Sequence, residues 1–93
     1  MKSIQVDVLL EAINCPVVQM PGRNYPGIVI QGDTLRSLLA EVEDVAVLCG
    51  DVGKPGLSDA VTGIKEMLIG YVRVYEHAMK EAGRSLPYPN PEV

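Results

Sequence analysis

The longest regular pattern of apolar residues runs through the second half of the chain and predicts two helices. Over residues 35–49, apolar side chains recur at spacings of three and four, which lines one side of a helix. Gly50 is expected to end this helix, and the glycine- and proline-containing loop 51–56 to reverse the chain. A second helix is expected over 58–83. It would be longer than the first, so its distal end would project beyond its partner.

The apolar positions of the second helix have nearly heptad spacing, which predicts antiparallel packing against the first helix. Outside this seam, Glu76 and Lys80 are placed to pair across one helical turn. The expected seam residues are Val61, Ile64, Leu68, Tyr71, Tyr75, Met79 and Ala82.

Two turn signals organise the first third of the chain. Pro21-Gly22 and Pro26-Gly27 each combine a proline that presets the first turn dihedral with a glycine that allows a positive φ. The runs 17–20 and 28–30 on either side are rich in β-branched residues, which predicts a β-hairpin. Just after it, Asp33 or Thr34 is expected to cap the first helix.

The segment before the hairpin carries two conflicting patterns. Residues 4–8 alternate as in a strand, whereas the run 9–13 prefers helix. We expect a helix over 4–14, which Pro16 prevents from continuing, and the alternative is a third strand beside the hairpin. The fold class is therefore α+β: an N-terminal helix or strand, a β-hairpin, and an antiparallel helical hairpin with a long C-terminal helix.

A single domain is expected over 1–84, followed by a Pro-rich extended tail over 85–93. Proline at alternate positions excludes helix and a central strand from this tail. It is either a disordered or loosely docked end, or a segment in which Tyr88, between two prolines, docks in a groove of a partner.

Composition and charge exclude several classes of function. The chain has 93 residues, of which 47% are hydrophobic, and this indicates one soluble domain with a small core. A net charge of -4, without a run of Lys or Arg, disfavours nucleic acid. No signal peptide or stretch of ~20 apolar residues is visible, so we expect a cytoplasmic protein without a membrane span. The isolated Cys15 and Cys49 agree with a reducing compartment.

Residue types that carry catalysis or hold cofactors are sparse. His77 is the one histidine, and neither cysteine has a second cysteine or a histidine at ligand spacing, so we expect neither metal nor cofactor. The run 50–54 lacks the glycine spacing of a phosphate loop and the Ser or Thr that follows its lysine. No serine lies in a nucleophile elbow, and we do not expect an enzyme.

Three groups of residues are candidates for binding. At the hairpin, an arginine fork beside a tyrosine ring is typical of binding hot spots, although the same residues can brace the turn. Acidic side chains on the first helix and its loop suit a basic partner. A second stripe on the last helix carries two glycines, which allow close approach of another backbone and indicate a self-interface. The groups are Arg23, Tyr25, Gln31 and Asp33; Glu41, Glu43, Asp44 and Asp51; and Gly63, Gly70, Val74 and His77.

Three short runs around the hairpin carry a resemblance to a known family: Pro21-Gly22-Arg23, Tyr25-Pro26-Gly27 and Gln31-Gly32-Asp33-Thr34-Leu35. Over residues 16–48 the chain resembles an uncharacterised family of small bacterial proteins of about this length. The resemblance implies a bacterial, cytoplasmic and compact protein and carries no catalytic residue with it. Small acidic bacterial proteins of this kind are often toxin-neutralising immunity proteins, an association by class and not by chemistry.

These observations predict a small acidic protein-binding module. The first hypothesis is an immunity-type or regulatory protein that binds another protein, such as a toxin, through its acidic surface and hairpin tip. The second is a structural homodimer built on the last helix. A third is a binder of a small anionic ligand that uses Arg23.

Overall fold

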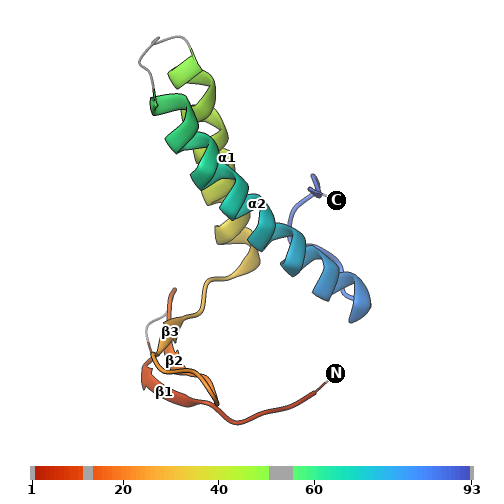
Figure 1. Cartoon of the computed structure of the whole chain (residues 1–93). Coiled ribbons are helices and arrows are strands. Elements are labelled where there is room, and N and C mark those ends of the chain that lie inside the picture. Colours follow the sequence, from red (N-terminus) through yellow and green to blue (C-terminus); the bar gives the residue numbers. More distant parts are fainter. Residues whose placement is uncertain (1, 12–13, 51–55, 93) are drawn as a thin grey trace. The chain divides into compact units, whose positions relative to one another are not determined.

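The computed structural model describes residues 2–11, 14–50 and 56–92 and contains a three-stranded sheet and two helices (Figure 1). The chain divides into two compact units, Met1–Gln31 with the sheet and Gly32–Val93 with the helices, and each is described by itself. The α+β class is confirmed, whereas the single domain over 1–84 stays a prediction.

The sheet is an antiparallel meander in the order β1-β2-β3, formed by β1 (Asp7–Leu10), β2 (Val17–Gln19) and β3 (Gly27–Ile28). In β2 and β3, Val17 pairs with Ile28 and Val18 with Gly27, which confirms the hairpin. The preferred N-terminal helix is wrong, because this segment forms β1 against β2, with an irregular register between Val8 and Leu10. Ladder pairing overrides the helix preference of Leu9 and Leu10, and residues 12–13 of the expected helix lie outside the described residues.

The hairpin turn confirms the first Pro-Gly signal. The backbone N–H of Arg23 donates to the carbonyl of Met20 at 3.3 Å, and Gly22 has a φ of 76°. This is the φ that the third position of a type II turn requires. The Gln19 side chain braces the same turn, because its Nε2 donates to the carbonyl oxygens of Arg23 at 2.7 Å and Met20 at 3.1 Å.

The helical unit is a hairpin of α1 (Gly32–Gly50) and α2 (Leu57–Glu81), which lie side by side in Figure 1. Both helices agree with the expected ranges, whereas the connecting loop 51–55 lies outside the described residues. At the start of α1, Asp33 Oδ1 accepts a hydrogen bond from the backbone N–H of Thr34 at 2.9 Å. Gly32 is buried against the ring of Tyr75 so closely that a Cβ would collide with it.

The core between the helices is small and consists of Leu39, Leu68 and Val72, with Leu35, Val42 and Ile69 packed against it. The expected seam on α2 is correct at four of its seven positions. Ile64 and Tyr71 are 53% and 56% exposed, and Ala82 is exposed as well, whereas Val72 is fully buried. The buried and half-buried heptad positions of α2 are Val61, Lys65, Leu68, Val72, Tyr75 and Met79.

The end of α2 turns the chain back on itself through a Schellman motif. The N–H of Gly83 donates to the carbonyl of Lys80 at 3.0 Å, and that of Arg84 donates to the carbonyl of Met79 at 2.9 Å. Gly83 has a φ of 68°, which is strained for any residue with a side chain. The following residues, 85–92, which we call the tail, therefore return along the helices (Figure 1).

Candidate functional site

A buried carboxylate on α2 holds the tail. Glu76 is only 4% exposed, and its Oε2 accepts a hydrogen bond from the Tyr88 hydroxyl at 2.7 Å. The backbone N–H of Glu92 donates to both carboxylate oxygens, at 2.8 and 3.0 Å. The solvent-facing pair expected between Glu76 and Lys80 is therefore wrong, because tail donors take the place of water around this carboxylate.

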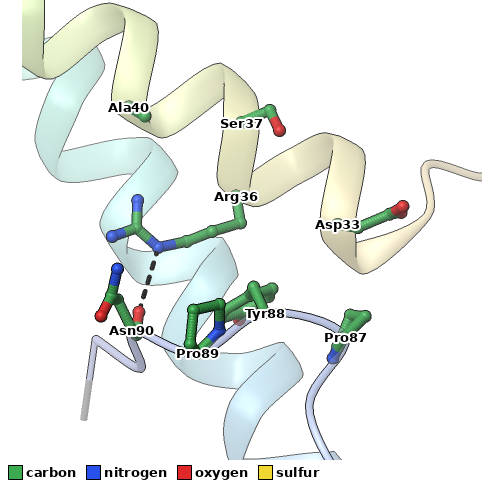
Figure 2. A pocket seen from close by; sticks show the side chains of 8 residues that line it. All are labelled: Asp33, Arg36, Ser37, Ala40, Pro87, Tyr88, Pro89 and Asn90. Atoms are coloured by element: carbon green, nitrogen blue, oxygen red, sulfur yellow. Dashed lines mark hydrogen bonds between the residues drawn. The ribbon is translucent and has the colours of Figure 1, made fainter.

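Arg36 on α1 holds the same tail from the other helix. Its Nε donates to the carbonyl oxygen of Asn90 at 3.4 Å, the dashed line in Figure 2. Its Nη2 lies 3.9 Å from Glu92 Oε2, and its guanidinium carbon lies 5.9 Å from the centre of the Tyr88 ring. A second ion pair joins Arg36 to Glu43 on the same helix at 3.5 Å. The tail is thus bound to both helices, and we call this set of contacts the tail latch.

The tail latch keeps the Tyr88 hydroxyl protonated. Burial, together with the hydrogen bond to Glu76 and the charge of that carboxylate, raises the pKa of Tyr88 far above its ordinary value, and Arg36 opposes the shift only in part. Tyr88 is therefore a donor throughout the physiological range. It is not a candidate general base.

Two hollows border the tail. The smaller, of about 320 Å³, lies between the first turns of α1 and the tail and is drawn in Figure 2. The larger, of about 600 Å³, lies between the last turns of α2 and the tail. The smaller is lined by Asp33, Arg36, Ser37, Ala40, Pro87, Tyr88, Pro89 and Asn90, and the larger by Arg73, Glu76, His77, Lys80, Arg84, Leu86 and Pro91.

Heptad positions show which side of the helical hairpin the tail covers. With the buried seam at a and d, Arg36 falls at e of α1 and Glu76 at e of α2, and in an antiparallel pair the e positions of both helices flank the same side. Both of these side chains bind the tail, as this placement requires. The g positions therefore flank the opposite side.

The side opposite the tail is apolar and exposed. It carries Leu38 and Val45 at the g positions of α1 and Ile64 and Tyr71 at those of α2, all between two fifths and three fifths exposed. Neighbouring c positions add further large side chains. We call this surface the apolar face; it consists of Leu38, Val45, Leu48, Ile64, Met67, Tyr71 and Val74.

The residues predicted at the hairpin are divided between the two units. Arg23 and Tyr25 line one hollow of about 370 Å³ at the hairpin tip, where Tyr25 is 83% exposed. Gln31 is exposed at the end of the first unit, whereas Asp33 belongs to the second and lines the smaller hollow beside the tail. Of the four predicted residues, Arg23 and Tyr25 line the hollow at the tip, together with Gly22 and Asn24.

The acidic group is divided as well. Glu41 and Asp44 are exposed on α1, Glu43 is half-buried and paired with Arg36, and Asp51 lies outside the described residues.

Of the predicted self-interface, Val74 is part of the apolar face. Gly63 and Gly70 border that face, and a Cβ on either would meet nothing within 4 Å. His77 instead lines the larger hollow on the tail side.

The sequence reasoning did not identify Arg36 and Glu76 as residues that bind the tail. It singled out Tyr88 for docking in a groove of a partner, whereas the Tyr88 hydroxyl binds Glu76 of the same chain. Glu76 lies seven residues after Ile69 and therefore on the same side of α2. This spacing was the signal from which the burial of Glu76 could have been predicted. Nothing in the pattern identified the donors that satisfy it, because they come from the proline-rich tail.

The described residues contain no group of three or more His, Cys, Asp or Glu side chains that could hold a metal ion. Both cysteines are free. Neither α1 nor α2, nor any other helix in the described part of the chain, combines the length and hydropathy that crossing a membrane requires.

The three-stranded sheet and the two helices define a small α+β protein. The chain belongs to a family of unknown function (DUF6959), whose model matches residues 1–88. The match includes the Pro21-Gly22 turn, both helices and Tyr88. It also includes Pro26-Gly27, where the expected turn is wrong because Gly27 has no positive φ and pairs with Val18 as part of β3. No curated protein and no solved structure matches the chain.

Proposed function

We propose that this protein is a protein-binding module that associates with a second copy of itself through the apolar face. The observation that carries the proposal is a second heptad stripe, contributed by both helices and left exposed opposite the tail. Two such hairpins joined face to face form a four-helix bundle in which each helix is buried along two seams. A two-fold axis allows this with identical surfaces on both partners.

The size of the apolar face suits a stable dimer. Seven large side chains of about 200 Å² each, roughly half exposed, present about 700–800 Å², close to the ~800 Å² per partner of a standard interface. The core supports the same proposal, because Leu39, Leu68 and Val72 are the only buried hydrophobic residues in the described part of the chain. A helical pair with so small a core gains stability by association.

Two valines of nearly equal exposure allow a matched test. Val74 is 70% exposed on the apolar face, whereas Val47 is 73% exposed on α1 and lies seven residues after Ala40, which borders the tail. Val74→Lys is expected to give a monomer, because a lysine charge would be buried in the dimer. Val47→Lys is expected to remain a dimer.

The measurement is the solution mass by light scattering over a range of protein concentrations. The wild-type protein is expected to have twice the mass of one chain. The dimer is expected to persist at high salt, because the stabilisation from buried apolar surface does not weaken with added salt. A wild-type monomer at every concentration would overturn the proposal. So would equal dissociation of the two lysine variants.

A second candidate is the immunity-type or regulatory binder of another, basic protein. The observation that favours it is the exposed pair Glu41 and Asp44 on α1, in a chain of net charge -4. Association steered by these acids would slow steeply as ionic strength rises, and Glu41→Gln with Asp44→Asn would slow it further. A rate that is flat with salt counts against this candidate.

A further inference from the structure

The larger hollow beside the tail collects positive charge in an acidic protein. Arg73, His77 and Lys80 follow one another at spacings of four and three along α2, so these three fall on one side of the helix. Arg84, in the Schellman motif at the end of α2, lines the same hollow. Three of the eight Lys and Arg residues and the one histidine of the chain therefore line a single cleft of about 600 Å³.

These charges are available to a ligand. All four side chains are exposed, and no ion pair in the described part of the chain involves Arg73, Lys80 or Arg84. The one acidic residue in the lining is Glu76, whose carboxylate accepts hydrogen bonds from the tail. With three cations against this single carboxylate, the cleft carries a net positive charge while the whole chain carries -4.

The opposite wall of the cleft is apolar and belongs to the tail. Leu86 and Pro91 form it, and Leu86 is half-buried. Tyr88, which lies between Leu86 and Pro91 in the sequence, and Glu92, which follows Pro91, both donate hydrogen bonds to Glu76 and so hold this wall in place. The apolar wall therefore exists only while the tail latch is closed.

We propose that this cleft binds a small organic phosphate, with the phosphate on the basic side of α2 and the organic group against Leu86 and Pro91. Guanidinium groups present paired N–H donors that match phosphate oxygens, and Lys80 adds a point charge. The volume lies in the range of small-molecule sites, in which an apolar lining surrounds a few polar groups. This site is separate from the apolar face, so it stands independently of the proposed dimer.

The test is titration of the ¹⁵N-labelled full chain with inorganic phosphate and with phenyl phosphate, followed by amide chemical shifts. Both probes are expected to give saturable shifts confined to residues that line the cleft. Phenyl phosphate is expected to bind about tenfold more tightly, because its ring contacts the apolar wall. Shifts that do not saturate, or that spread over all basic residues, would overturn the proposal.

Charge variants provide the matched control. Arg73→Gln with Lys80→Gln is expected to weaken binding of phenyl phosphate at least about tenfold, as expected when charge-assisted hydrogen bonds are lost. Lys2→Gln with Gln5→Glu lowers the net charge by the same two units at exposed positions of the other unit and is expected to leave the affinity unchanged. Equal losses in the two double variants would mean that net charge alone attracts the probe, and would overturn the site.

A tail variant tests the apolar wall separately. Leu86→Ala removes part of the apolar wall without changing the charge of the cleft. It is expected to reduce the advantage of phenyl phosphate over inorganic phosphate, while the affinity for inorganic phosphate stays within about twofold of wild type. An unchanged preference in this variant would overturn the role of the tail.

Discussion

Removal of one hydroxyl group tests whether the tail latch holds as the geometry indicates. In Tyr88→Phe, Glu76 loses the hydrogen bond of 2.7 Å and keeps the two contacts from the Glu92 N–H. A hydrogen bond to a charged group contributes about 1.5–3 kcal/mol, and the lower end applies because the Tyr88 side of the contact is only half-buried. The phenyl ring stays, so its contact with Arg36 is retained.

A loss of about 1.5 kcal/mol increases the open population of the tail roughly tenfold. The Glu92 amide reports this directly, because its N–H is bound to Glu76 only when the tail is docked. Hydrogen exchange of this amide is therefore expected to be about tenfold faster in Tyr88→Phe, while the amides of Leu39 and Leu68 in the core are unaffected.

Tyr25→Phe is the matched control, because that hydroxyl lies exposed at the hairpin tip of the other unit. It is expected to leave exchange at Glu92 unchanged. If Glu92 exchanges at the wild-type rate in Tyr88→Phe, the hydroxyl contributes nothing to docking and the reasoning fails. A double-mutant cycle with Glu76→Gln then measures the coupling between the two side chains.

The same contact makes tail docking depend on pH in the alkaline range. The pKa of Tyr88 is raised by burial and by Glu76, so the docked state binds the phenolic proton more tightly than the open state. The stabilisation of the docked tail by the protonated hydroxyl is complete below the ordinary tyrosine pKa of 10.0, and it is lost as the pH rises from there through the raised pKa of Tyr88. The difference in tyrosinate absorbance between wild type and Tyr88→Phe is expected to titrate above pH 10.0; a midpoint at or below it contradicts this.

Two helical glycines are expected to respond in opposite directions to alanine. Gly32→Ala should destabilise the helical unit by about 1–3 kcal/mol, because the new methyl group displaces the ring of Tyr75. Gly70→Ala should stabilise it by about 1 kcal/mol, because a Cβ there meets nothing within 4 Å and alanine favours helix. Urea unfolding followed by circular dichroism measures both changes in the free energy of unfolding. Gly70→Ala is made in the Val74→Lys background, which is expected to be monomeric. A change of the same sign in both variants would contradict the packing described.

Local signals predicted the parts of the fold that local chemistry decides. The Pro21-Gly22 turn and the helix start near Asp33 each depend on a residue whose backbone or capping preference acts on its immediate neighbours. Local signals failed for the N-terminal segment, where a helix was expected over 4–14. Its helix-favouring residues join β1 because β2 supplies a pairing partner, which is tertiary information.

The packed side of α2 was predicted only in part, because two stripes satisfy the same spacing. Ile64 and Tyr71 fit a heptad as well as Leu68 and Val72 do, and the pattern alone does not state which pair faces α1. The tail latch was missed for a related reason. A buried glutamate is tolerated only with partners, and the donors for Glu76 lie 12 and 16 residues further along the chain.

The partly mispredicted seam and the tail latch have a common explanation. A helix with two apolar stripes must bury both or leave one exposed, and in α2 the stripe with Leu68 and Val72 packs against α1. The tail covers the side where Arg36 and Glu76 lie, because these polar groups can be satisfied by its backbone and by Tyr88. The apolar face carries no charged group like Arg36 or Glu76 for a proline-rich segment to bind, and its one polar side-chain group is the Tyr71 hydroxyl. The tail therefore covers one side of the hairpin and leaves the other exposed. If both proposals hold, opening the tail latch changes ligand binding without changing the oligomeric state.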